Sequence, residues 1–555
     1  MIFTRREMLG AAGAAAMLAP LPAKAVQAGE GAFADVAPRV RSLAEAVLAR
    51  NGFPGISIAL VGPGYSVPFA AGLADFDSRS PASTGHLFQI GSITKSLTAM
   101  AVFVLAERGR VDFEGNVQAL LPDLPMPPEP ITVRQLLEHS SGLPNSLEQT
   151  PFLRVPGGRL WTGFAPGSRY SYCNLGYTLL GLIIERAAGM PFATALETLV
   201  LRPIGMSGAM PVVRTEERDL YASGHVRLRE DIPWLPRARL TEARWIDVHT
   251  AAGSVGANAH DMVRYLERII ALGRGHGGTL FSDALAVRYR TPTIASTHGP
   301  GARYGNGLAT LDVGGRPAMQ HTGGMIGFSS AMTVDPQARV GAYASVNVGG
   351  AAGYRPLEIT RYALALLRAA ASGAELPPVP EPEAARPVGD PRRFVGRWFG
   401  PDRREIGIVE RGGALFVASG GIERPLVAAG ERSLATDHPL LAPHLFAVEA
   451  GEPLVLRLGG ALYGRDAAPV APPTSARLSA LAGVYYSAAA WSPRLVVHAL
   501  GDRLFVGANA LSEAPDGSWR FSVPDLSSER IWFRDSIAGR PQTASVSGTD
   551  FARIG

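Results

Sequence analysis

A serine and a lysine three residues apart, Ser92 and Lys95, are the residues of this chain whose types and spacing best suit catalysis. Only two of the 53 basic residues are lysines, Lys24 and Lys95, and the rest are arginines. A buried lysine amine can lose its proton, whereas an arginine guanidinium does not. Residues i and i+3 of a helix share a face, so the Lys95 amine can reach the Ser92 hydroxyl. The pair predicts an activated serine nucleophile, against the alternative that an arginine-rich composition spared one lysine by chance.

A second motif, Tyr172-Cys173-Asn174, supplies a phenol and an amide two residues apart. On extended backbone, residues i and i+2 point the same way, so Tyr172 and Asn174 could face one site. A tyrosine has an ordinary pKa of about 10 and becomes a base at pH 7 only if that pKa falls to about 7, which requires about 4 kcal/mol. Two neighbouring cations would supply much of this energy. We expect Lys95 to be one of them and His321 the other.

The segments around these motifs predict a mixed arrangement of helices and strands. Apolar residues at helical spacing predict a helix over 92–108, with Ser92 in its first turn. Further helices are predicted over 40–48, 132–138, 175–188 and 354–371. Strands are predicted over 55–61, 316–321, 329–334 and 340–348. Strands at both ends of this region, with helices between them, indicate an antiparallel sheet with a helical insertion. His139 is expected to cap the end of a helix rather than to act in catalysis.

The chain repeats itself after a proline-rich segment over 373–390, which predicts a linker and a domain boundary. Two short sequences recur at nearly the same separation: those beginning at Phe394 and Leu415 match those beginning at Leu481 and Leu504. The repeat predicts tandem small antiparallel β-barrels. The alternative is a pair of unrelated β segments that share common turn sequences. The predicted barrel domains cover 391–466 and 476–555.

The first 28 residues predict an export signal. Arg5-Arg6 is a twin-arginine motif, a weakly apolar stretch follows it, and Ala23-Lys24-Ala25 is a small-x-small cleavage site. The apolar stretch is too short and too rich in Ala and Gly to span a bilayer. We therefore expect a periplasmic or secreted protein without a membrane span. The alternative is an ordinary N-terminal helix with a fortuitous arginine pair.

Composition excludes several classes of function. With 46% hydrophobic and 18% charged residues, the chain resembles folded globular proteins. No run of basic residues concentrates its net charge of +5, so we expect no nucleic acid partner. One cysteine, Cys173, excludes internal disulfides and thiolate-cluster metal sites, and we expect it to be a packing residue. Motifs of α/β-hydrolases, zinc peptidases and phosphate loops do not occur, which disfavours α/β-hydrolase, metallopeptidase and nucleotide chemistry.

Taken in chain order, Ser92-x-x-Lys95, Tyr172-x-Asn174 and His321-Thr322-Gly323 resemble the motifs of the serine β-lactamase and penicillin-binding peptidase family. The resemblance covers nearly all of 29–372. A catalytic domain followed by two small barrels, with Tyr-Cys-Asn where the family has Tyr-Ser-Asn, resembles the D-stereospecific aminopeptidases more loosely. Accessory sequences similar to the family lie at 136–143, 202–206, 252–254 and 304–307.

The resemblance implies the fold. The class is α/β (α+β), with a β-lactamase/DD-peptidase-like antiparallel sheet flanked by helices and a helical subdomain over 29–372. Two small lipocalin-like β-barrels follow. The resemblance also implies a Ser92 nucleophile whose proton is shared by Lys95 and Tyr172, and either of these two could be the general base. Asn174 would hold the substrate amide.

The resemblance implies a second set of roles along a strand. His321, with Thr322 and Gly323, would steer Tyr172 electrostatically and contact a carboxylate or carbonyl of the substrate. The backbone amides of Ser92 and Gly324 would form the oxyanion hole, and Gly324 is expected on an edge strand. No metal or cofactor is implied.

The expected function is that of an exported serine hydrolase that forms an acyl-enzyme on Ser92. Its expected substrates have amide bonds next to D-amino acids, as for a D-aminopeptidase or DD-peptidase. An esterase or weak β-lactamase would use the same residues, and a sensor or binding protein would be acylated without turnover. The aminopeptidase branch uses an acidic loop from its last barrel to recognise a free amino terminus. Here the connection 524–529 is short, and a role for Asp525 or Glu529 stays open.

Overall fold

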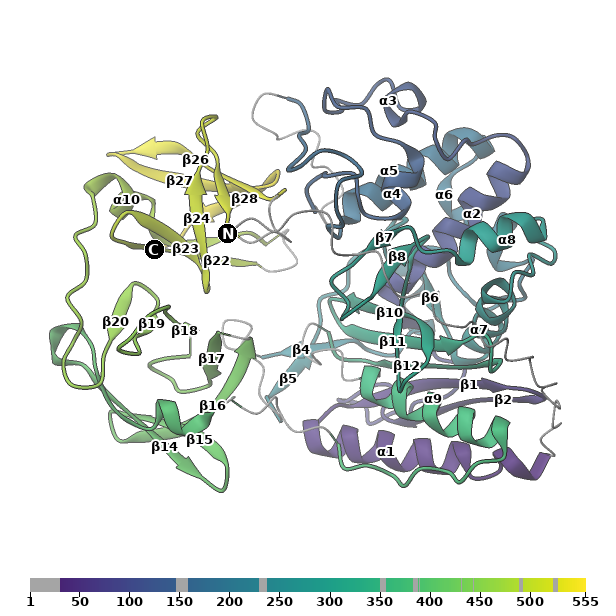
Figure 1. Cartoon of the computed structure of the whole chain (residues 1–555), viewed down its shortest axis with the longest axis horizontal. Helices are drawn as coiled ribbons and strands as arrows, with labels where there is room; N and C mark the ends of the chain where they lie inside the picture. The colour runs from purple at the N-terminus through teal and green to yellow at the C-terminus, as the bar shows by residue number, and fades with distance from the viewer. Residues whose placement is uncertain are drawn as a thin grey trace, which may run out of the picture.

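The computed structural model describes a large α/β domain and two small β domains, which lie on the right and left of Figure 1. The predicted export signal, 1–28, falls outside the described residues. These residues are 30–145, 158–228, 237–349, 356–382, 388, 390–430, 432–442, 444–488, 493–522 and 528–555.

The large domain is built on an eight-stranded antiparallel sheet. Its first strand, β1, pairs with its last strand, β12, on one side and with β2 on the other. This arrangement confirms the antiparallel sheet formed from both ends of the domain. In spatial order the strands are β2 (Tyr65–Gly72), β1 (Gly55–Gly62), β12 (Val340–Val346), β11 (Phe328–Asp335), β10 (Pro317–Met325), β9 (Leu308–Asp312), β8 (Arg303–Gly305) and β7 (Ile294–Ala295).

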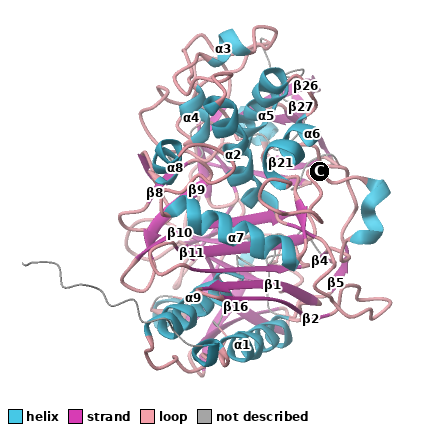
Figure 2. Cartoon of the chain, turned by 90° about the vertical axis from the view of Figure 1, so that its right-hand side faces the viewer, coloured by secondary structure: helices cyan, strands magenta, loops and turns pink. Residues whose placement is uncertain are grey.

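Helices cover both faces of this sheet (Figure 2). Helices α1 (Val36–Asn51) and α9 (Pro356–Ser372) pack on one face, where Ile58 and Leu60 of β1 join their apolar core. Helix α7 (Ala259–Gly273) packs on the other face, against the alternate β1 residues Ala59 and Val61. Side chains of a strand point alternately to its two faces, so a strand covered on both faces is apolar throughout.

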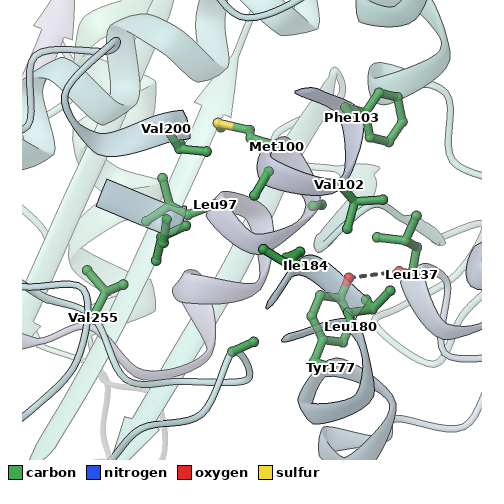
Figure 3. Packing of buried hydrophobic residues seen from close by; sticks show 14 of the residues in the cluster. Leu97, Met100, Val102, Phe103, Leu137, Tyr177, Leu180, Ile184, Val200 and Val255 are labelled. Atoms are coloured by element: carbon green, nitrogen blue, oxygen red, sulfur yellow. Dashed lines mark hydrogen bonds between the residues drawn. The ribbon is translucent and has the colours of Figure 1, made fainter. Parts of the chain in front are cut away.

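A helical subdomain is inserted between the second and the seventh strand. Its centre is α2 (Thr94–Glu107), in which every residue from Thr94 to Leu105 is buried. Figure 3 shows α2 packing against α5 (Asn174–Ala188) through side chains such as Leu97 and Ile184. The other helices of this region are α3 (Val117–Leu120), α4 (Val133–Leu137), α6 (Phe192–Leu196) and α8 (Asp283–Arg290). Two short strand pairs are β3 (Phe88–Gln89) with β6 (Gly256–Ala257), and β4 (His225–Arg227) with β5 (Leu240–Glu242).

Among the described helices, none alone is both long and apolar enough to cross a membrane. Helix α5 and the segment Phe192–Leu201 pass that test only together, as a pair bent by 79°.

The C-terminal region contains the two predicted barrels. The first is nearly closed, since an isolated bridge from Phe399 to Gly464 joins its first strand to the end of its last, and the second is closed. The first consists of β13 (Gly396–Phe399), β14 (Glu405–Arg411), β15 (Ala414–Ser419), β16 (Ile422–Gly430), β17 (Ser433–Thr436), β18 (Phe446–Val448), β19 (Leu456–Leu458) and β20 (Ala461–Tyr463). After α10 (Ala476–Leu481), the second consists of β21 (Gly483–Tyr486), β22 (Arg494–Leu500), β23 (Arg503–Val506), β24 (Asn509–Glu513), β25 (Trp519–Phe521), β26 (Arg530–Ile537), β27 (Arg540–Val546) and β28 (Thr549–Arg553).

The repeated sequences occupy equivalent places in the two barrels. One pair contributes the first strands, β13 and β21, and the other pair lies in the third strands, β15 and β23. The described part of the predicted linker packs along α1. Arg39 donates hydrogen bonds to the carbonyls of Leu376 and Pro377 (3.1 and 3.0 Å), and Arg50 donates one to that of Pro382 (2.9 Å).

Candidate active site

Ser92 lies in a single 3-10 turn, Gly91–Ile93, that leads directly into α2. Gly91 has a φ of +54°, and a Cβ there would stand 2.7 Å from the backbone nitrogen of Gly324, so this position requires glycine. Ser92 itself is half-buried. The turn therefore brings the serine backbone against β10 and leaves the hydroxyl accessible.

Lys95 stands one turn along α2 from Ser92 and is 0% exposed. Its Nζ is 3.0 Å from Ser92 Oγ, 2.7 Å from Asn174 Oδ1 and 2.7 Å from the carbonyl oxygen of Ala252. The amide and carbonyl oxygens have no protons, so they take two N–H bonds of the amine. The third neighbour of the amine is the Ser92 hydroxyl, which can donate a hydrogen bond. A neutral Lys95 can therefore donate to the two oxygens and accept the Ser92 proton with its lone pair.

Burial favours this neutral form. It lowers the pKa of Lys95 well below the usual 10.5, because a charged ammonium loses its hydration there. The amine is therefore available as a base for Ser92.

Tyr172 and Asn174 meet this pair from the start of α5. Lys95 Nζ lies 4.9 Å from the centre of the Tyr172 ring, and Asn174 is the first residue of the helix. Asn174 accepts from Lys95 through Oδ1 and donates through Nδ2 to Asn145 Oδ1, at 2.7 Å. Both ends of its amide thus contact protein groups, in addition to any substrate contact.

His321 is also nearby, but the prediction that it would be a cation is wrong. It is 4% exposed, and burial lowers its pKa to about 3. Its Nδ1 donates to the Thr322 carbonyl at 2.7 Å, so Nε2 accepts from the Tyr304 hydroxyl at 3.0 Å. The ring centre stands 6.5 Å from that of Tyr172. His321 is therefore a neutral group, and its two hydrogen bonds hold the backbone of β10 and the Tyr304 hydroxyl in place.

Gly323 and Gly324 belong to β10, which is an interior strand of the sheet and not the expected edge strand. Strand β9 pairs with β10 only over Pro317–Gln320, so among the described pairings the half from His321 onward bonds only to β11. This half of the strand faces the Ser92 turn. The interior strand thus has a local edge at the site, formed where β9 stops.

The two glycines differ in what surrounds them, which makes a matched test. A Cβ at Gly323 would lie 2.0 Å from the carbonyl oxygen of Ile90, whereas a Cβ at Gly324 would meet nothing within 4 Å. We expect Gly323→Ala to lower the free energy of unfolding by about 3 kcal/mol or more, since overpacking against backbone cannot relax locally. Gly324→Ala should stay within about 1 kcal/mol of wild type. Urea denaturation measures both values, and equal stability of the two variants would contradict this packing.

His139 ends α4, as expected, and it is also a buried part of the site. It follows the C-cap of α4 with a φ of +58°, is 0% exposed, and its Nδ1 accepts from the Cys173 backbone nitrogen at 3.1 Å. Its ring centre is 4.3 Å from that of Tyr172. Burial lowers the pKa of His139 well below 6.5. The neutral ring therefore holds the Tyr172-Cys173-Asn174 segment in place through its hydrogen bond to Cys173 and its contact with the Tyr172 ring.

Cys173 is a packing and capping residue. Its Sγ accepts from the Gly176 nitrogen at 3.2 Å, which caps α5, and burial raises the pKa of its thiol to about 12. A thiol with such a pKa does not supply a nucleophilic thiolate. Among the described residues, no group of three or more His, Cys, Asp or Glu side chains could hold a metal ion.

Sequence reasoning missed several partners of the site. The Ala252 carbonyl is a backbone group, so no residue type signals it. Tyr304 could have been singled out, because it lies in one of the accessory sequences. Asn145 comes from a segment without a motif, and only the fold brings it to Asn174. Of the two acidic residues whose role was left open, Glu529 contacts Asn145, and Asp525 lies outside the described residues.

Several known proteins are similar in sequence to this chain. Esterase EstB of Burkholderia gladioli is 32% identical over 304 residues, 46% of this chain and 74% of that protein. The D-aminopeptidase of Gluconobacter oxydans (strain 621H) is 28% identical over 309 residues, 53% of this chain and 55% of that protein.

A similar solved structure is the octameric penicillin-binding protein homologue from Pyrococcus abyssi. It is 24% identical, with a TM-score of 0.55, and the match covers 77% of this chain and 100% of that one. This likeness concerns the fold. The family model described as Beta-lactamase matches residues 40–367, well over half of the chain. The chain therefore belongs to the β-lactamase family of serine hydrolases.

Proposed function

We propose that this hydrolase works through an acyl-enzyme on Ser92 and cleaves amide bonds adjacent to D-amino acids. The observation that carries the proposal is the hydrogen-bond set of Lys95. An amine with two proton-free acceptors and one hydroxyl as neighbours is arranged to take a proton from that hydroxyl.

The reaction follows from this arrangement. The Ser92 proton passes to the neutral Lys95 amine while Oγ attacks the substrate carbonyl and forms a C–O bond. The backbone amides of Ser92 and Gly324 stabilise the oxyanion. The proton then moves to the departing amine, directly or through Tyr172, as the C–N bond breaks. Water attacks the resulting ester, with the same groups accepting its proton, and releases the acid.

The relative named D-aminopeptidase supports the proposed substrate class. A cavity of about 510 Å³ has Gln89 and Met325 in its lining, which lie close in the chain to Ser92 and Gly324. Charges of both signs line it, and Glu242 is ion-paired with Arg218, so the cavity does not by itself select a substrate amine.

A substrate panel tests this assignment. We expect kcat/KM to be highest for a D-alanyl anilide with a free amine, and at least about tenfold lower for its L-isomer and its N-acetyl form. A D-Ala-D-Ala peptide, nitrocefin and short p-nitrophenyl esters complete the panel. Absence of turnover on all of them, with Ser92 still labelled by a fluorophosphonate, would replace the hydrolytic function with that of an acylated sensor.

The second candidate function is that of an esterase or weak β-lactamase with the same catalytic residues. The 32% identity to esterase EstB over 304 residues favours it. Ester hydrolysis needs less help to the leaving group than amide hydrolysis does. If the p-nitrophenyl esters or nitrocefin give the highest kcat/KM of the panel, this candidate takes the place of the first.

We also propose that residues 1–28 direct export, which places the substrate outside the cytoplasm. The twin-arginine motif supports this proposal. Replacing Arg5 and Arg6 by lysine should leave the protein in the cytoplasmic fraction. An unchanged periplasmic or secreted fraction would contradict twin-arginine export.

A further inference from the structure

The second barrel packs directly against the loop that borders the active site. Trp161 donates its Nε1 hydrogen to the Ser528 carbonyl at 2.7 Å, and Ser528 Oγ donates to the Gly142 carbonyl at 2.8 Å. Trp532 and Arg530 of β26 pack on the Trp161 ring, with centres 5.0 and 4.8 Å away. Ser528 is 2% exposed. These contacts form a buried, packed junction between the barrel and the catalytic domain.

Glu529 connects this junction to the residues around the active site through its hydrogen bonds. Its carboxylate is 9% exposed and accepts from two groups, the Asn145 backbone nitrogen at 2.5 Å and the Ser547 hydroxyl at 2.6 Å. A buried carboxylate is tolerated only with such hydrogen bonds, and charge-assisted ones are among the strongest. Ser547 lies between β27 and β28. The barrel thus fixes the carboxylate, and the carboxylate fixes Asn145.

Asn145 in turn sets the orientation of the Asn174 amide. Asn145 Oδ1 accepts from both the backbone nitrogen and the Nδ2 of Asn174, at 2.9 and 2.7 Å. With Nδ2 held in this way, Oδ1 of Asn174 must point to the other side, where it accepts from Lys95 Nζ at 2.7 Å. A continuous chain of hydrogen bonds therefore links Glu529, through Asn145 and Asn174, to Lys95.

We infer that Glu529 of the second barrel is a positioning residue of the active site, which holds the Lys95 amine in place through Asn145 and Asn174. The inference rests on the proposed acyl-enzyme at Ser92. It assigns the barrel a part in the acylation step, and it gives Glu529 a role through its hydrogen bonds to protein groups. Without this support, Asn174 is free to turn, water reaches Lys95, and the pKa of the amine rises because its desolvation is relieved.

The test measures the rate at which a fluorophosphonate acylates Ser92, as a function of pH, in the full-length protein. We expect Glu529→Ala and Asn145→Ala each to slow acylation at neutral pH on the order of tenfold, with the acid limb of the profile moved to higher pH. The double variant should be no slower than the slower single variant, since both break the same chain of contacts. Glu529→Gln, which keeps an acceptor for Asn145, should acylate within about threefold of wild type.

Ser528→Ala is the matched control. It removes a hydrogen bond of the same junction but leaves Glu529 in place, so its acid limb should stay at the wild-type pH. Wild-type acylation by Glu529→Ala, additive losses in the double variant, or a Glu529→Gln loss equal to that of Glu529→Ala would each overturn the inference. These results differ from a failure of the proposed acyl-enzyme, in which wild-type protein is not labelled at Ser92 at all, and from a failure of the proposed substrate class, which the substrate panel detects.

Discussion

Ser92→Ala is expected to abolish fluorophosphonate labelling and to lower turnover of any substrate by at least about 10⁴-fold. Alanine removes only the hydroxyl that lies 3.0 Å from Lys95 Nζ, and residue 92 is half-buried in a short turn, so the fold should be retained. The measurement is labelling intensity together with kcat on the best substrate of the panel.

Ser141→Ala is a suitable control for this variant, because it removes one serine hydroxyl of the same domain that is buried and not accessible. It should keep the label. Labelling of Ser92→Ala at the wild-type level would place the nucleophile elsewhere and would reject the proposed function.

Lys95→Arg should be as damaging as Lys95→Met, with acylation slowed by about 10³-fold in both. Arginine keeps the positive charge but cannot take the Ser92 proton, and methionine keeps most of the volume without the amine. Acylation rates from fluorophosphonate labelling measure the effect, and thermal unfolding confirms that Lys95→Met folds. Near wild-type acylation by Lys95→Arg would show that charge, not proton transfer, is what this position supplies.

The same base gives the acylation rate a defined pH dependence. Below its pKa, Lys95 carries a proton and cannot accept another, so acylation should fall as the pH falls through that value and should be retained above it. Burial places this pKa well below 10.5. His321 has a pKa of about 3 and remains neutral above it, so its titration cannot cause a fall in the acylation rate nearer neutral pH. In Lys95→Met the acylation rate should therefore no longer fall with decreasing pH.

Much of the fold could be predicted because its signals are local. The strand predicted at 55–61 is Gly55–Gly62, and the helix predicted at 175–188 is Asn174–Ala188, since apolar periodicity and flanking glycines mark such elements. The helix predicted at 92–108 differs at its start, where Gly91–Ile93 forms a 3-10 turn before α2. Glycine at 91 allows this turn, and its close approach to β10 is not visible in the sequence.

The motif residues came together as predicted, but their environments could not be read from the sequence. Lys95, His139 and His321 are all buried, and it is burial that removes the charge expected on His321. Whether a side chain is desolvated depends on segments far away in the chain. The contact from Glu529 to Asn145 joins residues 384 apart, and no local pattern encodes such a pair.

The complete burial of Lys95 has a consequence for chemical labelling of the protein. No other lysine occurs in the described part of the chain, and this one is 0% exposed, so the folded surface there offers no side-chain primary amine to an acylating or cross-linking reagent. Conventional amine coupling would thus spare that surface. Modification of residue 95 would therefore require the packing between α2 and α5 to open.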